Sequence, residues 1–219
     1  MVPRKTRSGI AHVSVRLPKS YAPESSRRYP LLLVLGELQA KPWTDSLHAE
    51  GVLPEMIVAT APISAEGGAE FAPAALLANL AEVYRILEAP EGRWICGAGH
   101  DGISAMRAVL DPPDLFGCGA CLSGSFEGAE GEPPLQSTIL RDLEERRSLT
   151  KGRRLYFDYG TLGLDECYEP YHRDLGAILR GKGWGDGSEF TIQRVQGGSH
   201  DIVSWQARLG VALQWLAAR

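Results

Sequence analysis

The sequence predicts a single α/β domain, in which a mostly parallel sheet is covered by helices on both faces. Three observations support this fold class. Apolar runs of strand length recur along the chain, segments with helical spacing lie between and after the later runs, and the composition is that of an ordinary globular protein. Strands that alternate with helices favour a parallel sheet buried on both faces. The 219 residues suit one such domain, so residues 1–219 are expected to fold as one unit.

The expected strands are short apolar runs. In chain order they are residues 12–17, 31–35, 56–61, 93–97, 117–123, 154–160 and 189–195. Only a short connection joins the first run to the second. We therefore expect the first strand to enter the sheet antiparallel to its neighbour.

The expected helices are amphipathic or apolar segments between these runs. One stripe holds Leu76, Leu77, Leu80, Val83, Tyr84 and Leu87, a second holds Leu175, Ile178 and Leu179, and a C-terminal stripe holds Val203, Leu209, Leu213, Trp215 and Leu216. The charged run at residues 141–147 is expected to be a solvated helix face. Residues 125–137, rich in Gly, Pro and Glu, form the clearest loop, either a cap insertion or a surface excursion.

Composition excludes several function classes. A net charge of −4 without a basic patch argues against nucleic acid and anionic membrane surfaces as partners. No apolar run approaches the roughly 18 residues of a membrane span. Arg4, Lys5 and Arg7 are not followed by the apolar segment of a signal peptide, so a cytoplasmic protein is expected, although an export signal already removed would leave no trace.

The cysteines and histidines give little sign of a metal or redox site. Cys118 and Cys121 form a CxxC pair, but the sequence has no second pair and no histidine close by. His12, His48 and His172 lack metal-ligand spacing. We therefore expect these cysteines to pack in the core, and we expect neither a metal nor a cofactor.

Six segments, in chain order, resemble the esterase D and enterochelin-esterase-like branch of the α/β-hydrolases. They are VRLPKSY (15–21) with RRYPLLLVLG (27–36), Trp43 with GVLPEMIVATAP (51–62), LANLAEVYRIL (77–87), DPPDLFGCGACLSGSF (111–126), YFDYGTLGLDE (156–166) and GGSHDIVSWQARL (197–209). The resemblance covers nearly the whole chain. It implies a three-layer α/β-hydrolase fold.

The resemblance also implies the positions of a catalytic triad. Hydrolases of this fold carry a serine nucleophile in a G-x-S-x-G turn, then an acid, then a histidine. In this sequence His200 matches the histidine and Asp165 the acid, with Asp158 a second choice for the acid. The turn GAGHDG (97–102) places Gly99 at the nucleophile position, where it offers no hydroxyl.

Further departures surround the same pocket. The family's His-Gly at the end of the oxyanion strand is Leu35-Gly36 here, and Glu37 follows. A Glu37 carboxylate that pointed inward would repel a developing oxyanion. Asp101 replaces the small glycine of the turn. Two expectations complete the pocket: the backbone N–H of His100 faces the oxyanion site, and Trp43 and Trp205 line the wall.

Three functions remain open at this point. The first is a non-hydrolytic protein that binds a small acyl or ester-like ligand, or a protein partner, through the former active-site pocket. The second is a carboxylic-ester hydrolase in which His200 and Asp165 activate water or an unassigned group attacks. The third is a structural or interaction subunit, for example a homo-oligomer. Removal of the serine from such a triad lowers kcat by a factor on the order of 10⁶, which favours the first or third function.

Overall fold

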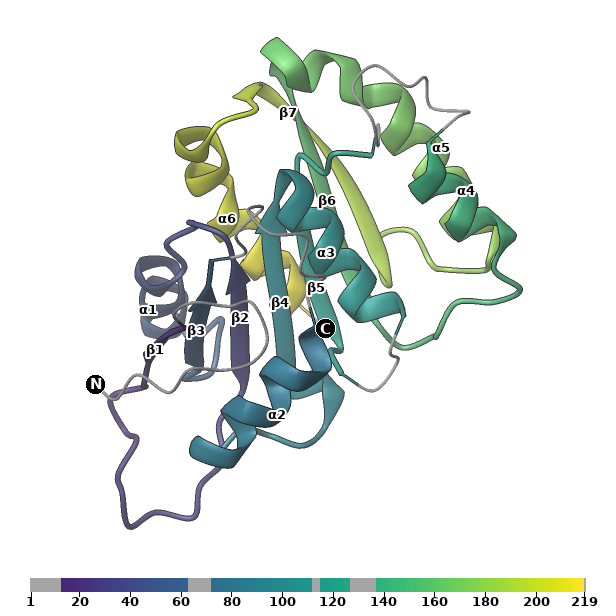
Figure 1. Ribbon diagram of the computed structural model, residues 1–219. Helices are drawn as coiled ribbons and strands as arrows, with labels where there is room; N and C mark the ends of the chain where they lie inside the picture. Colours follow the sequence, from purple (N-terminus) through teal and green to yellow (C-terminus); the bar gives the residue numbers. More distant parts are fainter. Residues whose placement is uncertain (1–12, 63–71, 112–114, 127–136, 219) are drawn as a thin grey trace.

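A seven-stranded sheet forms the centre of the protein (Figure 1). The computed structural model describes residues 13–62, 72–111, 115–126 and 137–218. The strands are β1 (Ser14–Arg16), β2 (Leu31–Leu35), β3 (Ile57–Ala61), β4 (Arg93–Ala98), β5 (Cys118–Leu122), β6 (Arg154–Leu162) and β7 (Phe190–Ser199). Each coincides with one of the apolar runs, so all seven predicted strands are confirmed.

The strands are arranged in the order β1-β3-β2-β4-β5-β6-β7. All neighbouring pairs from β3 to β7 are parallel, and β1 runs antiparallel to β3. The antiparallel entry is therefore confirmed, with β3 as the partner. Because the strands from β2 to β7 are parallel, their carboxyl ends meet at one edge of the sheet, where open α/β sheets bind ligands.

Helices cover both faces of this sheet. Helices α1 (Lys41–Ala49) and α6 (Ile202–Ala217) pack on one face, and α2 (Pro73–Val83), α3 (Gly99–Leu110), α4 (Thr138–Glu145) and α5 (Glu169–Gly181) pack on the other. In β2, Leu31, Leu33 and Leu35 face the larger group, while Leu32 and Val34 face α1 and α6. Burial on both faces explains why the strands are apolar throughout.

Two predicted helical segments end earlier than expected. Helix α2 stops at Val83 because Tyr84 has extended backbone angles, and Leu87 therefore lies beyond the helix. Helix α4 stops at Glu145, and Leu143 within the charged run is buried. That run is thus only partly a solvated face. Arg146, just after the helix, pairs with Asp111 and Asp142.

The CxxC cysteines lie within β5 on opposite faces of the sheet. Cys121 packs with the α2 to α5 side and Cys118 with the α1 and α6 side, and both thiols are buried and free. Residues three apart in a strand point in opposite directions, so the two thiols do not converge on one ligand. Their placement supports a packing role.

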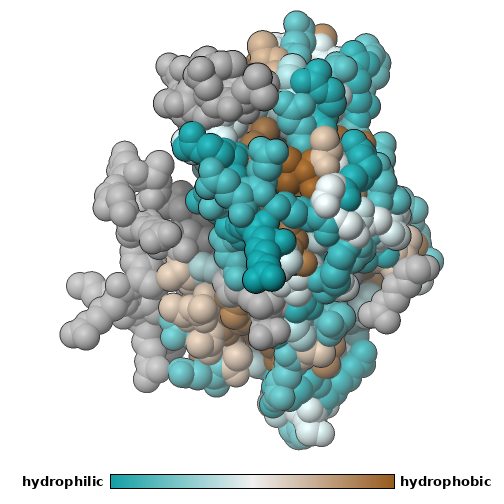
Figure 2. Space-filling view, turned by 90° about the vertical axis from the view of Figure 1, so that its right-hand side faces the viewer, coloured by the Kyte–Doolittle hydropathy of each residue, from teal (hydrophilic) through white to brown (hydrophobic). Residues whose placement is uncertain are grey.

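Two further observations concern the surface. The face on the side of α4 and α5 is mainly hydrophilic, and its apolar side chains show in small separate areas (Figure 2). Among the described helices, none is long and apolar enough to cross a bilayer.

Most of the loop predicted at residues 125–137 lies outside the described residues, as does His12.

Candidate functional site

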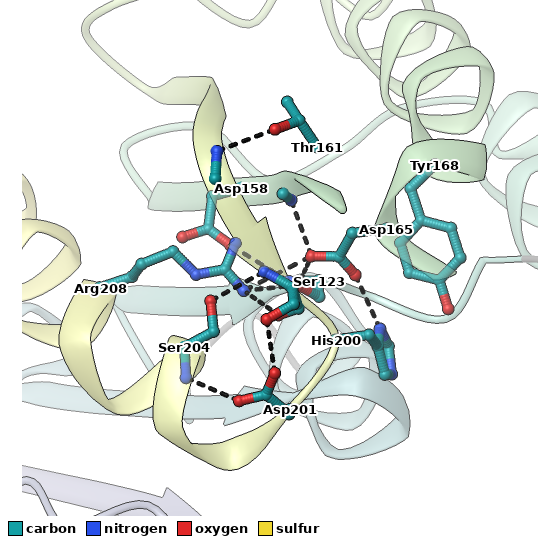
Figure 3. A network of polar contacts seen from close by, with 12 residues as sticks. Ser123, Asp158, Thr161, Asp165, Tyr168, His200, Asp201, Ser204 and Arg208 are labelled. Carbon is teal, nitrogen blue, oxygen red and sulfur yellow. Dashed lines mark hydrogen bonds and ion pairs between the residues drawn. The ribbon is translucent and has the colours of Figure 1, made fainter. Parts of the chain in front are cut away.

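The candidate site lies at the carboxyl edge of the sheet, where four segments converge. Gly99 follows β4, Ser123 follows β5, and His200 follows β7. Asp165 lies in η3 (Gly163–Tyr168), a short helix directly after β6. Parallel strand order therefore brings together residues that are far apart in the sequence (Figure 3).

Gly99 occupies a sharp turn between β4 and α3. Its φ of +56° lies in the left-handed region, which glycine adopts without a steric penalty. A Cβ built on Gly99 would lie 3.5 Å from Nε2 of His200 and 3.6 Å from Oγ of Ser125. The turn also requires Gly97, since a Cβ there would clash with the backbone of Asp101. The turn therefore aims position 99 directly at the imidazole of His200.

His200 is held by Asp165. Its Nδ1 lies 2.8 Å from Oδ1 of Asp165. The carboxylate accepts this hydrogen bond, so Nδ1 carries the proton and Nε2 of the neutral ring remains an acceptor that faces Gly99. Asp165 is fully buried, and the His200 side chain is 18% exposed. This is the orientation in which a histidine serves as a general base.

The Asp165 carboxylate is satisfied on its other oxygen as well. Oδ2 accepts hydrogen bonds from Oγ of Ser123 at 2.6 Å and from the backbone N–H of Gly160 at 2.7 Å. Burial alone would raise the pKa of Asp165, but the hydrogen bonds from His200, Ser123 and Gly160 hold this pKa below its usual value. Asp165 therefore remains ionised and fixes the imidazole in one orientation.

Ser123, which donates a hydrogen bond to Asp165, has a rare backbone conformation. Its φ of +43° makes it the one non-glycine residue with positive φ in the described parts of the chain. Its N–H donates to the carbonyl of Asp158 at 2.9 Å, and its Oγ accepts from Nη2 of Arg208 at 2.8 Å. Such strain concentrates at functional sites, where surrounding contacts maintain it.

Arg208, from α6, lies between the two buried carboxylates of the site. Nη1 lies 3.3 Å from Oδ1 of Asp158, and Nη2 lies 3.5 Å from Oδ2 of Asp165. Burial raises the pKa of Asp158 to about 7, although Arg208 opposes this shift. Asp158, the second choice for the acid, thus pairs with Arg208, and Asp165 is the carboxylate that accepts the hydrogen bond from His200. Sequence reasoning misses Arg208, although a charged residue within the apolar stripe of α6 is a signal for it. Ser123 falls where the resembled family has a structural Ser-Gly-Ser, and its contacts with Asp165 and Arg208 agree with that structural role.

The end of β2 forms the other wall of the site. Gly36 has a φ of +81°, and a Cβ there would clash with Oδ2 of Asp101. The carboxylate against Gly36 thus belongs to Asp101, while Glu37 is exposed. Burial raises the pKa of Asp101, and His100 opposes that shift. The His100 side chain is itself exposed.

The two tryptophans expected in the wall have different places. Trp43 is half-buried on α1, where Nε1 donates to the carbonyl of Gln206 at 2.9 Å and the ring lies against Gly210. It therefore joins α1 to α6 rather than lining the site. Trp205 does contact His200, with ring centroids 4.8 Å apart, and Tyr168 flanks the same imidazole at 5.4 Å.

Two hollows of about 270 Å³ each lie away from this turn, on the α5 side of the sheet. Both are lined by Tyr159 and Glu169, and charged side chains that pair with one another surround them. Glu169 lies 3.8 Å from Arg194, and Arg180 lies 2.9 Å from Asp186. Exposed ion pairs of this kind are ordinary surface features. The Gly99 turn is therefore the stronger candidate site, because the side chains around it are positioned by buried contacts.

Solved structures share this architecture. A ferulic acid esterase superimposes with a TM-score of 0.74 at 18% identity, covering 94% of this chain and 91% of that protein. The ferric enterobactin esterase of Salmonella typhimurium gives 0.70 at 20% identity, with 98% of this chain covered, and this chain spans 59% of its length. A fluorophosphonate-binding serine hydrolase of Staphylococcus aureus gives 0.65 at 14%, covering 96% and 95%. No family model and no curated protein matches the sequence. The chain has the α/β-hydrolase fold, as the sequence predicted.

Proposed function

We propose that this protein is a non-hydrolytic relative of esterases with the same fold, in which Gly99 replaces the nucleophilic serine. One observation carries the proposal. Position 99 points at Nε2 of His200, with a Cβ-to-nitrogen distance of 3.5 Å, and this position has no hydroxyl. An acyl-enzyme needs a nucleophile there, within reach of the base.

The neighbouring serines do not substitute for the missing group. The Ser123 hydroxyl donates to Asp165 and accepts from Arg208, so it is engaged within the buried network. Ser125 is buried, with 3% of its surface exposed, and its hydroxyl contacts the Tyr168 hydroxyl at 3.5 Å. Neither side chain extends from the turn between β4 and α3, where the backbone N–H groups of an oxyanion site would converge.

The intact His200–Asp165 pair supports a binding role for the former active-site pocket. Burying two carboxylates and a guanidinium is expensive unless each is paired, and here the contacts around Asp165 are complete. We propose that this scaffold presents Nε2 of His200 to a small acyl or ester-like ligand, or to a partner. Two of the structural neighbours are esterases, and this supports a proposed origin of the pocket in a protein that bound esters.

The test is hydrolysis of p-nitrophenyl acetate by the purified protein and by the His200→Ala variant. We expect both proteins to show the same rate as buffer, because loss of the serine lowers kcat by a factor on the order of 10⁶. Turnover by the wild-type protein that disappears in His200→Ala would contradict the proposal.

Ester hydrolysis by activated water is a second candidate function, favoured by the space over Gly99. A water between Nε2 of His200 and Oγ of Ser125 would occupy the place of a serine hydroxyl. His200 would take its proton, the oxygen would attack the acyl carbon, and the alcohol would leave with that proton. This function predicts His200-dependent turnover without a covalent intermediate, so the same assay separates the two candidates.

A further inference from the structure

The two edge strands of the sheet differ in how well they are protected against pairing with another strand. An edge strand presents a row of backbone donors and acceptors, and proteins usually shorten, charge, kink or cover such a strand. At one edge, β1 has only three residues. At the other edge, β7 has ten residues without a proline or a lysine, and its pairing with β6 is regular from Phe190 to Val195 (Figure 1). The edge that is open to a further strand is therefore β7.

The pairing with β6 fixes which backbone groups of β7 point away from the sheet. Leu155 of β6 donates its N–H to the carbonyl of Glu189 at 2.9 Å, just before β7 begins. In a parallel ladder of this register, every second residue after Glu189 turns its N–H and C=O toward β6. The backbone groups of Phe190, Ile192 and Arg194 consequently point outward.

Only the first of these three residues has partners on the outer side. The N–H of Phe190 donates to the carbonyl of Gly185 at 3.2 Å, and its carbonyl accepts from the N–H of Gly187 at 2.7 Å. Within the described parts of the chain, no hydrogen bond reaches the outward N–H or C=O of Ile192 or Arg194. Arg194 is also exposed, so this part of the edge is open to solvent.

A second copy of the chain matches this row of groups. Two identical strands related by a twofold axis run antiparallel, so that the same outward groups face each other. With Gln193 at the axis, Ile192 of each copy lies opposite Arg194 of the other, and each such pair exchanges both of its backbone hydrogen bonds. The pairing therefore satisfies the outward donors and acceptors of both copies at once.

The neighbouring registers are less favourable. With Arg194 at the axis, two guanidinium groups would lie opposite each other, and like charges in that position are destabilising. With Ile192 at the axis, Arg194 would lie opposite Phe190, whose backbone groups are already bonded. In the register about Gln193, Arg194 keeps Glu169 of its own copy as a partner at 3.8 Å, so no unpaired charge is buried.

We propose that the protein forms a symmetric dimer in which two β7 strands pair antiparallel about Gln193 and join the two sheets into one. The proposal is independent of the proposed function, because neither Ile192 nor Arg194 belongs to the hydrogen-bond network of His200.

Sedimentation equilibrium over a range of protein concentrations tests the dimer. The wild-type protein is expected to reach the mass of two chains. Arg194→Pro removes an outward N–H and leaves the donors to β6 in place, so it should weaken the dimer about tenfold or more. Arg194→Ala is the matched control, because it removes the same side chain, keeps the N–H and should remain dimeric. Circular dichroism melts establish that both variants are folded.

A disulfide tests the register without disturbing the backbone. Opposite residues of a pair without mutual hydrogen bonds have Cα atoms about 4.5 Å apart, within the reach of a disulfide. In a Cys167→Ser background, which removes the exposed cysteine, Gln193→Cys should therefore link two chains under mild oxidation. Gln196→Cys is equally exposed but would lie roughly 20 Å from its counterpart, so it should stay unlinked.

Three results would overturn the proposal. They are a wild-type protein that stays monomeric at every concentration, a dimer as tight in Arg194→Pro as in Arg194→Ala, and linkage of Gln196→Cys in preference to Gln193→Cys.

Discussion

Arg208→Ala is expected to destabilise the protein by about 3–5 kcal/mol, because it leaves two buried carboxylates without their cation. Asp158 and Asp165 are both fully buried, and the Arg208 guanidinium lies within 3.5 Å of each. A loss of this size is a large part of the stability of a typical domain, about 5–15 kcal/mol. Urea unfolding curves, monitored by circular dichroism, measure this loss in the free energy of unfolding.

Two comparisons make this result specific. Arg173→Ala removes an exposed guanidinium that pairs with Asp174, and its effect should stay within about 0.5 kcal/mol. The difference in the free energy of unfolding between the wild type and Arg208→Ala should also shrink as the pH is lowered. Burial already raises the folded-state pKa of Asp158, and without Arg208 this pKa rises further. Asp158 in the folded variant therefore binds a proton at a higher pH than in the unfolded chain, so the stability lost through the mutation is partly regained toward acid. Equal stabilities for Arg208→Ala and Arg173→Ala would show that the buried carboxylates do not depend on Arg208.

Gly99→Ser is expected to lower stability and to add reactivity. The φ of +56° at position 99 is unfavourable for any residue with a Cβ, and the conformational strain costs about 1–3 kcal/mol of stability. At this chain length the melting temperature should fall by roughly 2–4 °C for each kcal/mol. The new hydroxyl would lie beside Nε2 of His200, so weak esterase activity should appear, limited by the Asp101 carboxylate against Gly36.

Gly99→Ala is the matched control for this variant. It introduces the same backbone strain without a hydroxyl, so it should lose similar stability and gain no activity. Thermal melts and p-nitrophenyl acetate hydrolysis, measured on both variants, separate the two effects. A Gly99→Ser protein as stable as the wild type would mean that residue 99 does not require glycine.

The fold was predictable because burial on both faces leaves a direct trace in the sequence. Strands such as β2, where all five residues are buried, read as uninterrupted apolar runs. The end of α2 was not predictable from its stripe. Tyr84 and Leu87 continue the helical spacing in the sequence. In the structure, however, the chain becomes extended at Tyr84, and Ile86 forms an isolated parallel β-bridge with Tyr29.

The site was only partly accessible from the sequence. His200, Asp165 and Gly99 followed from the order of family-like segments. Ser123 and Arg208, which lie 85 residues apart, meet only through tertiary packing. Which of two nearby carboxylates turns inward is also a packing outcome. Asp101 is held against Gly36 by the first turn of α3, while Glu37 turns to solvent.

The most direct test of the central claim is the intact mass of the protein after incubation with a fluorophosphonate, a reagent class bound by one of the structural neighbours. The wild-type protein is predicted to keep its unmodified mass. Gly99→Ser should gain one phosphonyl group, and the double variant Gly99→Ser/His200→Ala should react far more slowly, because the base is gone. A phosphonyl adduct on the wild-type protein that maps to Ser123 or Ser125 would show that a working nucleophile exists, and would contradict the claim that Gly99 leaves this site without one.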